Sequence, residues 1–430
     1  MQWTEFVACI LQYKTYNPLF IASFLVLQKL FAKIQTFILW IYYFGRPPFQ
    51  SKVRKKRIIM RYLPDGWALQ FHINFIGLHS GFYDSTCLLD SDVHLFSIDS
   101  KIACFVSIPS HIKLYDPVKY PFYNWAMFDH ATHVYEVPVR LFTDIARTLK
   151  RCDKPLVFLS STGRCGSTLL TNIFAETQRV GVVSNWEISP LYEDFQYNKV
   201  SEYELIPIIR AALTYLLREQ NELMRDKDVC FIKLFSQYCS IIPLAQKIFP
   251  DIKVLFLTRN GLKCVNSFER ILTYHWYPFH FQWAPLKRFM INARRKWLDL
   301  DEQKDSEIID LITSLPLLYV ASWAKNMRLY LDMHRADDNI RWTCYEDIVI
   351  HRERCIGEIF QYCGLDKTLA NIGIRALKYD SQKNLDIKRT SQYSNCDKGM
   401  KFAADKICDF YGAPMVDETN MTMSGKLKPI

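Results

Sequence analysis

The chain has 430 residues, of which 50% are hydrophobic, and its formal net charge is +10. This composition excludes a largely disordered chain, and the length allows one large domain with a smaller one, or two medium domains. The basic excess favours anionic partners such as nucleotides, sulfated or phosphorylated molecules, nucleic acid or an anionic membrane, and does not choose among them.

The first predicted element is a strongly apolar stretch at residues 15–44, within an N-terminal segment that we place at 1–50. It is long enough to cross a bilayer, but Lys29 and Lys33 interrupt it on one helical face. Three interpretations remain: a membrane anchor, an interfacial amphipathic helix, or a buried helix packed on the globular part. We expect membrane association. A basic cluster at 52–57 would keep the C-terminal side in the cytosol under the positive-inside rule.

Residues 51–150 contain short β-like runs separated by turn residues and carry no catalytic motif. We therefore predict a small β-rich accessory region there. The expected strands are Arg57–Tyr62, Ala68–Phe75, His94–Ser97, Ala103–Ile108 and His133–Val137.

From Lys154 the pattern changes to short apolar strands that alternate with helical stretches. This alternation predicts an α/β domain with a mostly parallel sheet over residues 151–430. The expected strands are Val157–Ser160, Val180–Ser184, Cys230–Lys233 and Val254–Thr258, and the expected helix after the first strand is Thr168–Glu176.

The segment at 156–170, LVFLSSTGRCGSTLL, has the pattern of a phosphate- or sulfate-binding loop. An apolar strand runs into a turn of small residues, and a helix follows. Gly163 and Gly166 allow the backbone to curl so that N–H groups point inward, and the helix N-terminus adds partial positive charge. Arg164 can reach the anion. The residues expected to hold it are Gly163, Arg164, Cys165, Gly166, Ser167 and Thr168.

This loop departs from the ATP- and GTP-binding pattern GxxxxGK[ST], because Ser161 replaces the first Gly and Ser167 replaces the Lys. No later apolar strand ends in an evident Mg²⁺-binding Asp, since the strands end at Arg259 and Lys233. A metal-dependent NTPase is therefore disfavoured. A strand–turn–helix with chance glycines is the simpler alternative.

The stretch TGRCGSTLL at 162–170 resembles the 5′-phosphosulfate loop of sulfotransferases, which has the form GRxGST in the membrane and bacterial branches. Cytosolic members have a Lys in the register of Arg164. The resemblance implies a P-loop-type three-layer α/β sandwich with a parallel sheet, preceded here by the β-rich region and the apolar helix. It also implies the donor 3′-phosphoadenosine-5′-phosphosulfate (PAPS), and no metal.

A second anion motif lies at 253–268, where an apolar strand ends at Arg259 and the next helix carries Ser267. A guanidinium fork and a hydroxyl suit a phosphate dianion. The pair resembles the sulfotransferase motif for the 3′-phosphate of the nucleotide. The usual Asp/Asn-Pro after the Arg is Asn260-Gly261 here, which is a mild departure.

The resemblance also suggests catalytic residues. Lys233 matches the Lys of the Lys-Thr-His strand in cytosolic sulfotransferases, but Phe235 stands where the catalytic His would be. Glu187 follows a predicted strand where related sequences carry Ser-Glu-Pro, and it is the candidate general base. A structural salt bridge is the alternative for this Glu. We thus predict catalytic roles for Arg164, Lys233 and Glu187.

Further segments resemble the family with less specific consequences. The segment YEDIV at 345–349 is similar to the family's YEDL, and we interpret it as structural. Lys388 and Arg389 lie where a C-terminal segment of some members closes over the donor, although a solvated charge pair is the simpler interpretation. An aromatic patch at 274–283 suits either an acceptor pocket or buried packing.

These features predict sulfuryl transfer from PAPS to a hydroxyl or amine acceptor of undetermined class. One alternative is a non-catalytic P-loop protein that binds nucleotide. Another is an ATP-dependent kinase or NTPase. We expect no nucleic-acid partner, because no known reading module is present. The compartment, Golgi lumen or cytosol, is left open.

Overall fold

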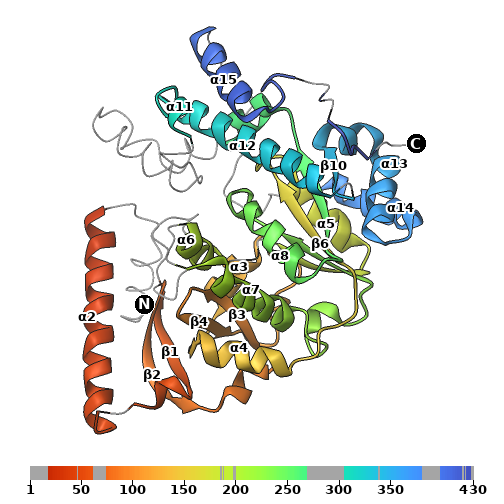
Figure 1. Ribbon diagram of the computed structural model, residues 1–430. Coiled ribbons are helices and arrows are strands. Elements are labelled where there is room, and N and C mark those ends of the chain that lie inside the picture. The colour runs from red at the N-terminus through yellow and green to blue at the C-terminus, as the bar shows by residue number, and fades with distance from the viewer. Residues whose placement is uncertain are drawn as a thin grey trace, which may run out of the picture. The chain divides into compact units, whose positions relative to one another are not determined.

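The computed structural model consists of two compact units, and Figure 1 shows their helices and strands. Unit 1 comprises residues 1–115, 122–153 and 187–225, and unit 2 comprises residues 116–121, 154–186 and 226–430. Within them, the described residues are 18–45, 47–61, 74–184, 186, 188–196, 200–268, 305–337, 339–379, 398–418, 421 and 423–427.

Unit 1 is built on a five-stranded antiparallel sheet with the strand order β2-β1-β5-β4-β3. The inner strands β4 and β5 carry valines and aromatic residues that are buried, which is the composition expected of half- or fully buried strands. The strands are β1 (Val53–Arg61), β2 (Phe75–Tyr83), β3 (Val93–Ile98), β4 (Ile102–Ser107) and β5 (His133–Pro138).

Helices complete unit 1, and aromatic side chains join them to the sheet. The rings of Phe105 on β4, Phe142 on α4 and Tyr215 on α7 pack edge-on within 6 Å of one another. The helix α7 begins with a capping box made by Ser201 and Glu204. The helices are α3 (Tyr123–His130), α4 (Val139–Thr148), α6 (Ser189–Gln196) and α7 (Glu202–Leu216).

A 25-residue helix, α2 (Pro18–Tyr42), precedes the sheet of unit 1. Gln28 and Gln35 donate from their side-chain amides to the carbonyl oxygens of Phe75 and Gly77 on the edge strand β2. Among the described residues, no helix combines the length and the apolar character that crossing a membrane requires. The three interpretations of residues 15–44 stay predictions.

The expected strands of residues 57–137 match unit 1 in part. Observed strands cover the expected runs at 94–97 and 133–137, and β4 overlaps the run at 103–108. Most of the strand expected at Ala68–Phe75 cannot be compared, because residues 68–73 lie outside the described part. The observed strand β2 begins at Phe75, and it is not predicted from the sequence. Gly77 and Gly81 weaken the sequence pattern of this strand, because glycine has a low strand propensity.

Unit 2 contains a five-stranded sheet in which every strand pairing is parallel, with the order β10-β9-β6-β8-β7. Its strands are buried and rich in Val, Leu, Ile and Phe, as expected of a parallel sheet covered on both faces. The prediction of a mixed α/β fold with a parallel sheet is confirmed. The strands are β6 (Leu156–Ser161), β7 (Val180–Ser184), β8 (Val229–Lys233), β9 (Lys253–Thr258) and β10 (Arg341–Cys344).

The helices of unit 2 connect and cover these strands. Parallel neighbours require crossover connections, and helices supply most of them. For example, α5 packs against β7 and β8, and α13 packs against β9 and β10. The principal helices are α5 (Ser167–Glu176), α8 (Ile242–Ile248), α12 (Leu315–Ala336), α13 (Tyr345–Cys363) and α15 (Lys398–Tyr411), and residues 261–268 after β9 are also helical.

The strand order brings the predicted site segments to one edge of this sheet. Strand β6 lies between β8 and β9, so the chain turns in opposite directions from β6 toward its two neighbours. Ligands of open parallel sheets bind outside the carboxyl ends of the strands at such a reversal. The segments that follow β6, β8, β9 and β10 here include the glycine loop, Arg259 and Tyr345, while Lys233 closes β8.

Candidate functional site

The loop after β6 has the backbone that an anion cradle needs. Gly163, Arg164 and Gly166 all have positive φ values, of 74°, 52° and 90°. A side chain at Gly163 would place its Cβ 2.9 Å from the Phe268 ring, and one at Gly166 would place its Cβ 2.4 Å from the Tyr345 ring. Both glycines are therefore required by close packing as well as by backbone conformation.

The helix α5 begins directly after this loop, at Ser167, and no side chain caps its N-terminus. The first N–H groups of a helix lack intrahelical partners and carry partial positive charge. Thr168, in the first turn, is buried. The Cys165 side chain is also fully buried, and burial raises the pKa of its thiol, so any contact of Cys165 with a bound anion would come from its main chain.

Lys233 lies at the carboxyl end of β8, beside β6, and is only 4% exposed. Its Nζ donates a hydrogen bond to the Thr168 hydroxyl at 3.1 Å. Burial, with a smaller contribution from the nearby guanidinium of Arg164, lowers the pKa of this lysine to about 7. The ammonium would be stabilised by any anion that entered the loop, so this position is suited to binding negative charge.

The two anion motifs found in the sequence meet in the structure. Arg164, within the loop, donates from its Nε to the Ser267 hydroxyl at 3.1 Å. Ser267 is buried in the helix that follows β9, although 103 residues separate the two positions. The loop's Thr162 hydroxyl also lies 4.0 Å from the Cys264 sulfur of the same helix. The two anion motifs thus form one contiguous group of residues.

Arg259 follows β9 and stands between a ring and a carboxylate. Its guanidinium carbon lies 4.6 Å from the centre of the Tyr345 ring, a cation–π contact. Its Nε lies 3.9 Å from a Glu346 carboxylate oxygen, beyond hydrogen-bond distance. Within the described chain, this buried Nε has no hydrogen-bond partner. Lys263 approaches the same Glu346 carboxylate at 3.4 Å.

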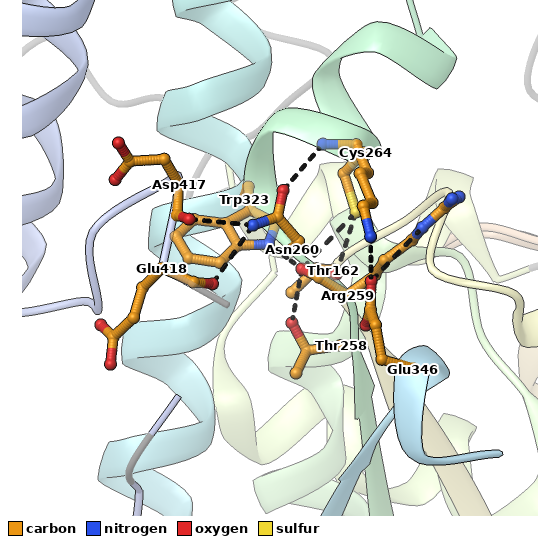
Figure 2. Close-up of polar contacts among 10 residues, drawn as sticks. Thr162, Thr258, Arg259, Asn260, Cys264, Trp323, Glu346, Asp417 and Glu418 are labelled. Carbon is orange, nitrogen blue, oxygen red and sulfur yellow. Dashed lines mark hydrogen bonds and ion pairs between the residues drawn. The ribbon is translucent and has the colours of Figure 1, made fainter. Parts of the chain in front are cut away.

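Contacts with a C-terminal segment explain the Asn260-Gly261 pair after this arginine, and Figure 2 shows Asn260 beside Asp417 and Glu418. The Asn260 side-chain amide donates to the carbonyl oxygens of Asp417 and Glu418, each at 3.2 Å. A Cβ at Gly261 would lie 2.6 Å from Val416, so a larger residue would clash. The departure from the family's Asp/Asn-Pro therefore suits the packing of residues 416–418.

Tertiary contacts also hold the main chain of Arg259 in place. The indole N–H of Trp323, on α12, donates to the Arg259 carbonyl oxygen at 3.1 Å (Figure 2). Below the loop, the rings of Phe268 and Tyr319 stack with their centroids 4.4 Å apart. These packed aromatic residues fix the backbone from which the cationic side chains extend.

Sequence reasoning did not assign Tyr345, Glu346 or Lys263 to the site. From the sequence we interpret the YED segment as structural, and the position of Tyr345 beside Gly166 and Arg259 agrees with an orienting role. The signal available for Lys263 was its spacing, four residues before Ser267 on one helical face. Its approach to Glu346 depends on the pairing of β9 with β10, which the sequence does not reveal.

Several predicted residues cannot be placed. Glu187, the candidate base, lies outside the described residues, as do Lys388 and Arg389 and the aromatic patch at 274–283. Phe235 is described, and its ring packs edge-on against Tyr238 at 6.1 Å. A phenyl ring cannot accept a proton, so this position supplies no base.

No group of three or more His, Cys, Asp or Glu residues that could hold a metal ion occurs in the described ranges. The expectation that the chemistry requires no metal stays a prediction.

Comparison with known proteins identifies a family. The profile of the sulfotransferase domain matches residues 154–409, which is more than half of the chain. The solved sulfotransferase domain from the curacin biosynthetic pathway is 14% identical; the match covers 62% of this chain and 100% of that one, with a TM-score of 0.32. A comparison with curated proteins finds no match.

Proposed function

The chain belongs to the sulfotransferase domain family, and from that premise we propose that it transfers a sulfuryl group from PAPS to a hydroxyl or amine acceptor. Membership itself supports a transferase of the sulfotransfer type. The choice of donor, the residue roles and the retention of catalysis are the proposal.

The observation that carries the proposal is the contact between the two anion motifs. Arg164 of the glycine loop donates to Ser267 of the helix after β9, and Arg259 and Lys233 lie at the ends of the strands on either side of the loop strand. A nucleotide with phosphates at both its 5′ and 3′ positions needs two cationic sites that lie close together. Two neighbouring anion sites can bind both phosphates of such a nucleotide, whereas a single phosphate loop can bind only one.

The residues present fit such a nucleotide. The loop backbone curls at three positions with positive φ, Gly163, Arg164 and Gly166, and no side chain caps the N-terminus of the helix that follows. The Arg259 Nε is buried without a hydrogen-bond partner among the described residues, and a phosphate oxygen would satisfy it. We therefore assign the 5′-phosphosulfate to residues 163–168 and the 3′-phosphate to Arg259 and Ser267.

PAPS supplies an activated sulfuryl group, whose S–O bond to the 5′-phosphate breaks as the bond to the acceptor forms. Arg164, Lys233 and the loop N–H groups would stabilise the negative charge that develops on the phosphate oxygen left behind. The acceptor proton requires a base. Glu187 is our candidate, because Phe235 occupies the place of the histidine used by cytosolic members.

Phe235 also favours a second candidate function, which is donor binding without transfer. If no other residue takes the acceptor proton, the chain would bind the nucleotide and not turn it over. This alternative shares both anion sites with the first, so binding alone does not separate the two.

The first test is a thermal-shift titration of the full chain with the product nucleotide PAP (3′,5′-bisphosphoadenosine), and separately with ATP and Mg²⁺. A ligand specific for the folded state adds about 2.7 kcal/mol at a hundredfold excess over its Kd. We expect PAP to stabilise the wild type and not Arg259→Ala. Arg335→Ala, which removes an exposed arginine paired with Asp332, should respond as the wild type does.

The second test measures transfer of labelled sulfate from PAPS to a panel of carbohydrate, lipid, tyrosine-peptide and phenol acceptors. Transfer that is lost in Arg164→Ala supports the enzyme, and PAP binding without any transfer supports the non-catalytic alternative. Stabilisation by Mg²⁺-ATP but not by PAP would contradict both.

A further inference from the structure

The helix α2 exposes a continuous stripe of large apolar side chains. Six of them are 49–61% exposed, in a protein whose other strands and helices bury most such residues. They are Leu27, Leu30, Ile34, Phe37, Ile38 and Ile41. Side chains spaced by three and four positions share one face of an α-helix, so the six form a single stripe about four turns long.

The opposite side of α2 is attached to the sheet of unit 1 by polar contacts. Besides the two hydrogen bonds that the Gln28 and Gln35 side chains donate to β2, the backbone N–H of His79 donates to the side-chain oxygen Oε1 of Gln35 at 3.1 Å. Because β2 is the edge strand, these glutamines occupy hydrogen-bonding groups that no further strand takes up. Figure 1 shows α2 in red, running alongside the β1–β2 hairpin. The helix is thus fixed with its apolar stripe turned away from that hairpin.

Lysines border the stripe. Lys29 and Lys33 are exposed, and Lys33 sits three residues after Leu30 and four before Phe37. No carboxylate lies on α2, because residues 6–64 contain no Asp or Glu at all. The same 59 residues hold ten Lys and Arg, and removing these ten leaves 44 basic against 44 acidic residues. The entire formal excess of +10 is therefore concentrated in the segment that carries the stripe.

Aromatic side chains mark the C-terminal end of α2. Trp40 and Tyr42 are more than half exposed, and Phe44, just beyond the helix, is 95% exposed. Trp and Tyr rings favour the boundary between lipid headgroups and acyl chains, because one part of each ring is apolar and another is polar.

We propose that α2 binds the surface of a negatively charged lipid bilayer, lying parallel to it. The apolar stripe would enter the boundary between headgroups and acyl chains, and Lys29 and Lys33 would meet the lipid phosphates. An apolar stripe bordered by lysines, with aromatic residues at one end, is the pattern of helices that lie in a bilayer surface. A second copy of the chain fits less well, since symmetric pairing through this stripe would bring the lysines of both copies together.

This binding is independent of the proposed sulfuryl transfer, and its test uses the full chain. The protein is mixed with vesicles of phosphatidylcholine, or of phosphatidylcholine with 30% phosphatidylserine, and recovered by flotation. The test variant I34Q/F37Q/I41Q keeps residues of good helix propensity while removing the stripe. The matched control is Y203Q/I350Q, which removes two apolar side chains that are 86% and 70% exposed on α7 and α13.

We expect the wild type and the control to float with the phosphatidylserine vesicles, and the triple variant to bind them at least about tenfold more weakly. K29Q/K33Q should lose about tenfold on phosphatidylserine vesicles and little on phosphatidylcholine alone. An unchanged thermal midpoint shows that each variant is folded.

Three results would overturn the proposal. The wild type could fail to float with either kind of vesicle, or the triple variant could float as the wild type does. Alternatively, light scattering without vesicles could find that the triple variant converts a dimer to a monomer, which would identify a second copy as the occupant of the stripe.

Discussion

The two halves of the candidate site hold their positive charge in different ways. Lys233, at the loop, is almost completely buried and donates to a neutral hydroxyl, that of Thr168. Arg259, at the neighbouring strand end, has a side chain that is 24% exposed and faces the Glu346 carboxylate and the Tyr345 ring. Burial penalises the charge at the first position, whereas an internal carboxylate partly balances it at the second.

This difference indicates how each half would respond to an anion. At the loop, a bound anion would raise the lysine pKa back toward its usual value, so binding there should take up a proton. At the 3′ half, an anion must compete with Glu346, so binding there should depend on salt more than on pH. The Tyr345 ring touches both halves, since it lies against Gly166 and under Arg259.

We expect the largest loss of PAP affinity from a substitution that disrupts the contact between the two halves of the site. Gly166→Ala places a methyl group 2.4 Å from the Tyr345 ring, at a position with φ of 90°. We expect PAP affinity to fall by more than about a hundredfold, because the loop and the ring that supports Arg259 move together. Overpacking and backbone strain together should lower the free energy of unfolding by about 2–5 kcal/mol. Calorimetric titration and urea unfolding measure the two quantities.

Gly364→Ala is the matched control. Gly364 also has a φ of 90°, but a Cβ there meets nothing closer than 3.9 Å, and it lies at the C-terminal end of α13. It should cost only the backbone strain of about 1–3 kcal/mol and leave PAP affinity unchanged. Equal losses of PAP affinity in both variants would show that the close approach to Tyr345 is unimportant.

The next largest effect is expected from replacing the buried Lys233. Lys233→Met removes the ammonium while keeping much of its apolar volume, and we expect PAP affinity to fall by about ten- to a hundredfold, as for a charge-assisted hydrogen bond. The unliganded variant should be more stable than the wild type at pH 7.5, because folding of the wild type must either bury the ammonium or remove its proton. A variant that is both less stable and unchanged in affinity would contradict the assignment.

The pH dependence of stability follows from the same lysine. Its pKa is about 7 in the folded state and near 10.5 when unfolded, so the unfolded chain binds more protons between these values. Stability of the wild type relative to Lys233→Met should therefore rise as pH increases from about 7 to about 10, and should not change below pH 7. Urea unfolding of both proteins at pH 6, 7.5 and 9.5 measures this. If the difference in free energy of unfolding between the two proteins did not change with pH, Lys233 would not be buried as the structure has it.

The smallest expected effect concerns the carboxylate that partly balances the positive charge of Arg259. Glu346→Gln removes the carboxylate that lies near Arg259 and Lys263, and we expect PAP to bind about two- to fivefold more tightly at low salt. The gain should disappear at about 0.5 M salt, because screening weakens partly exposed pairs. Glu353→Gln, an exposed position on the same helix, should change nothing. Weaker binding by Glu346→Gln would indicate that the carboxylate instead orients the arginine.

The local chemistry of the site could be read from the sequence, because it depends on neighbouring residues. The glycines of the loop, the helix after it and the cationic strand ends all lie within short segments. The alternation of buried strands with helices likewise indicates a parallel sheet, since such strands are apolar on both faces. The glycine-containing strand β2 is not predicted from the sequence, because its residues give a weak local signal.

Contacts between distant segments were decided only by the tertiary structure. The strand order sets β6 between β8 and β9, and this alone brings Lys233, Arg164 and Ser267 together across more than a hundred residues. The grouping of residues 187–225 with the N-terminal unit is of the same kind.

The sequence by itself therefore determined which residues could bind anions, because curled glycine loops and cationic strand ends are local patterns. Only the tertiary structure decided that Tyr345 and Glu346 stand beside Arg259, and that the lysine at the end of β8 is buried with a lowered pKa. Strand pairing and burial are properties of the whole packed sheet, and no short segment of the chain specifies them.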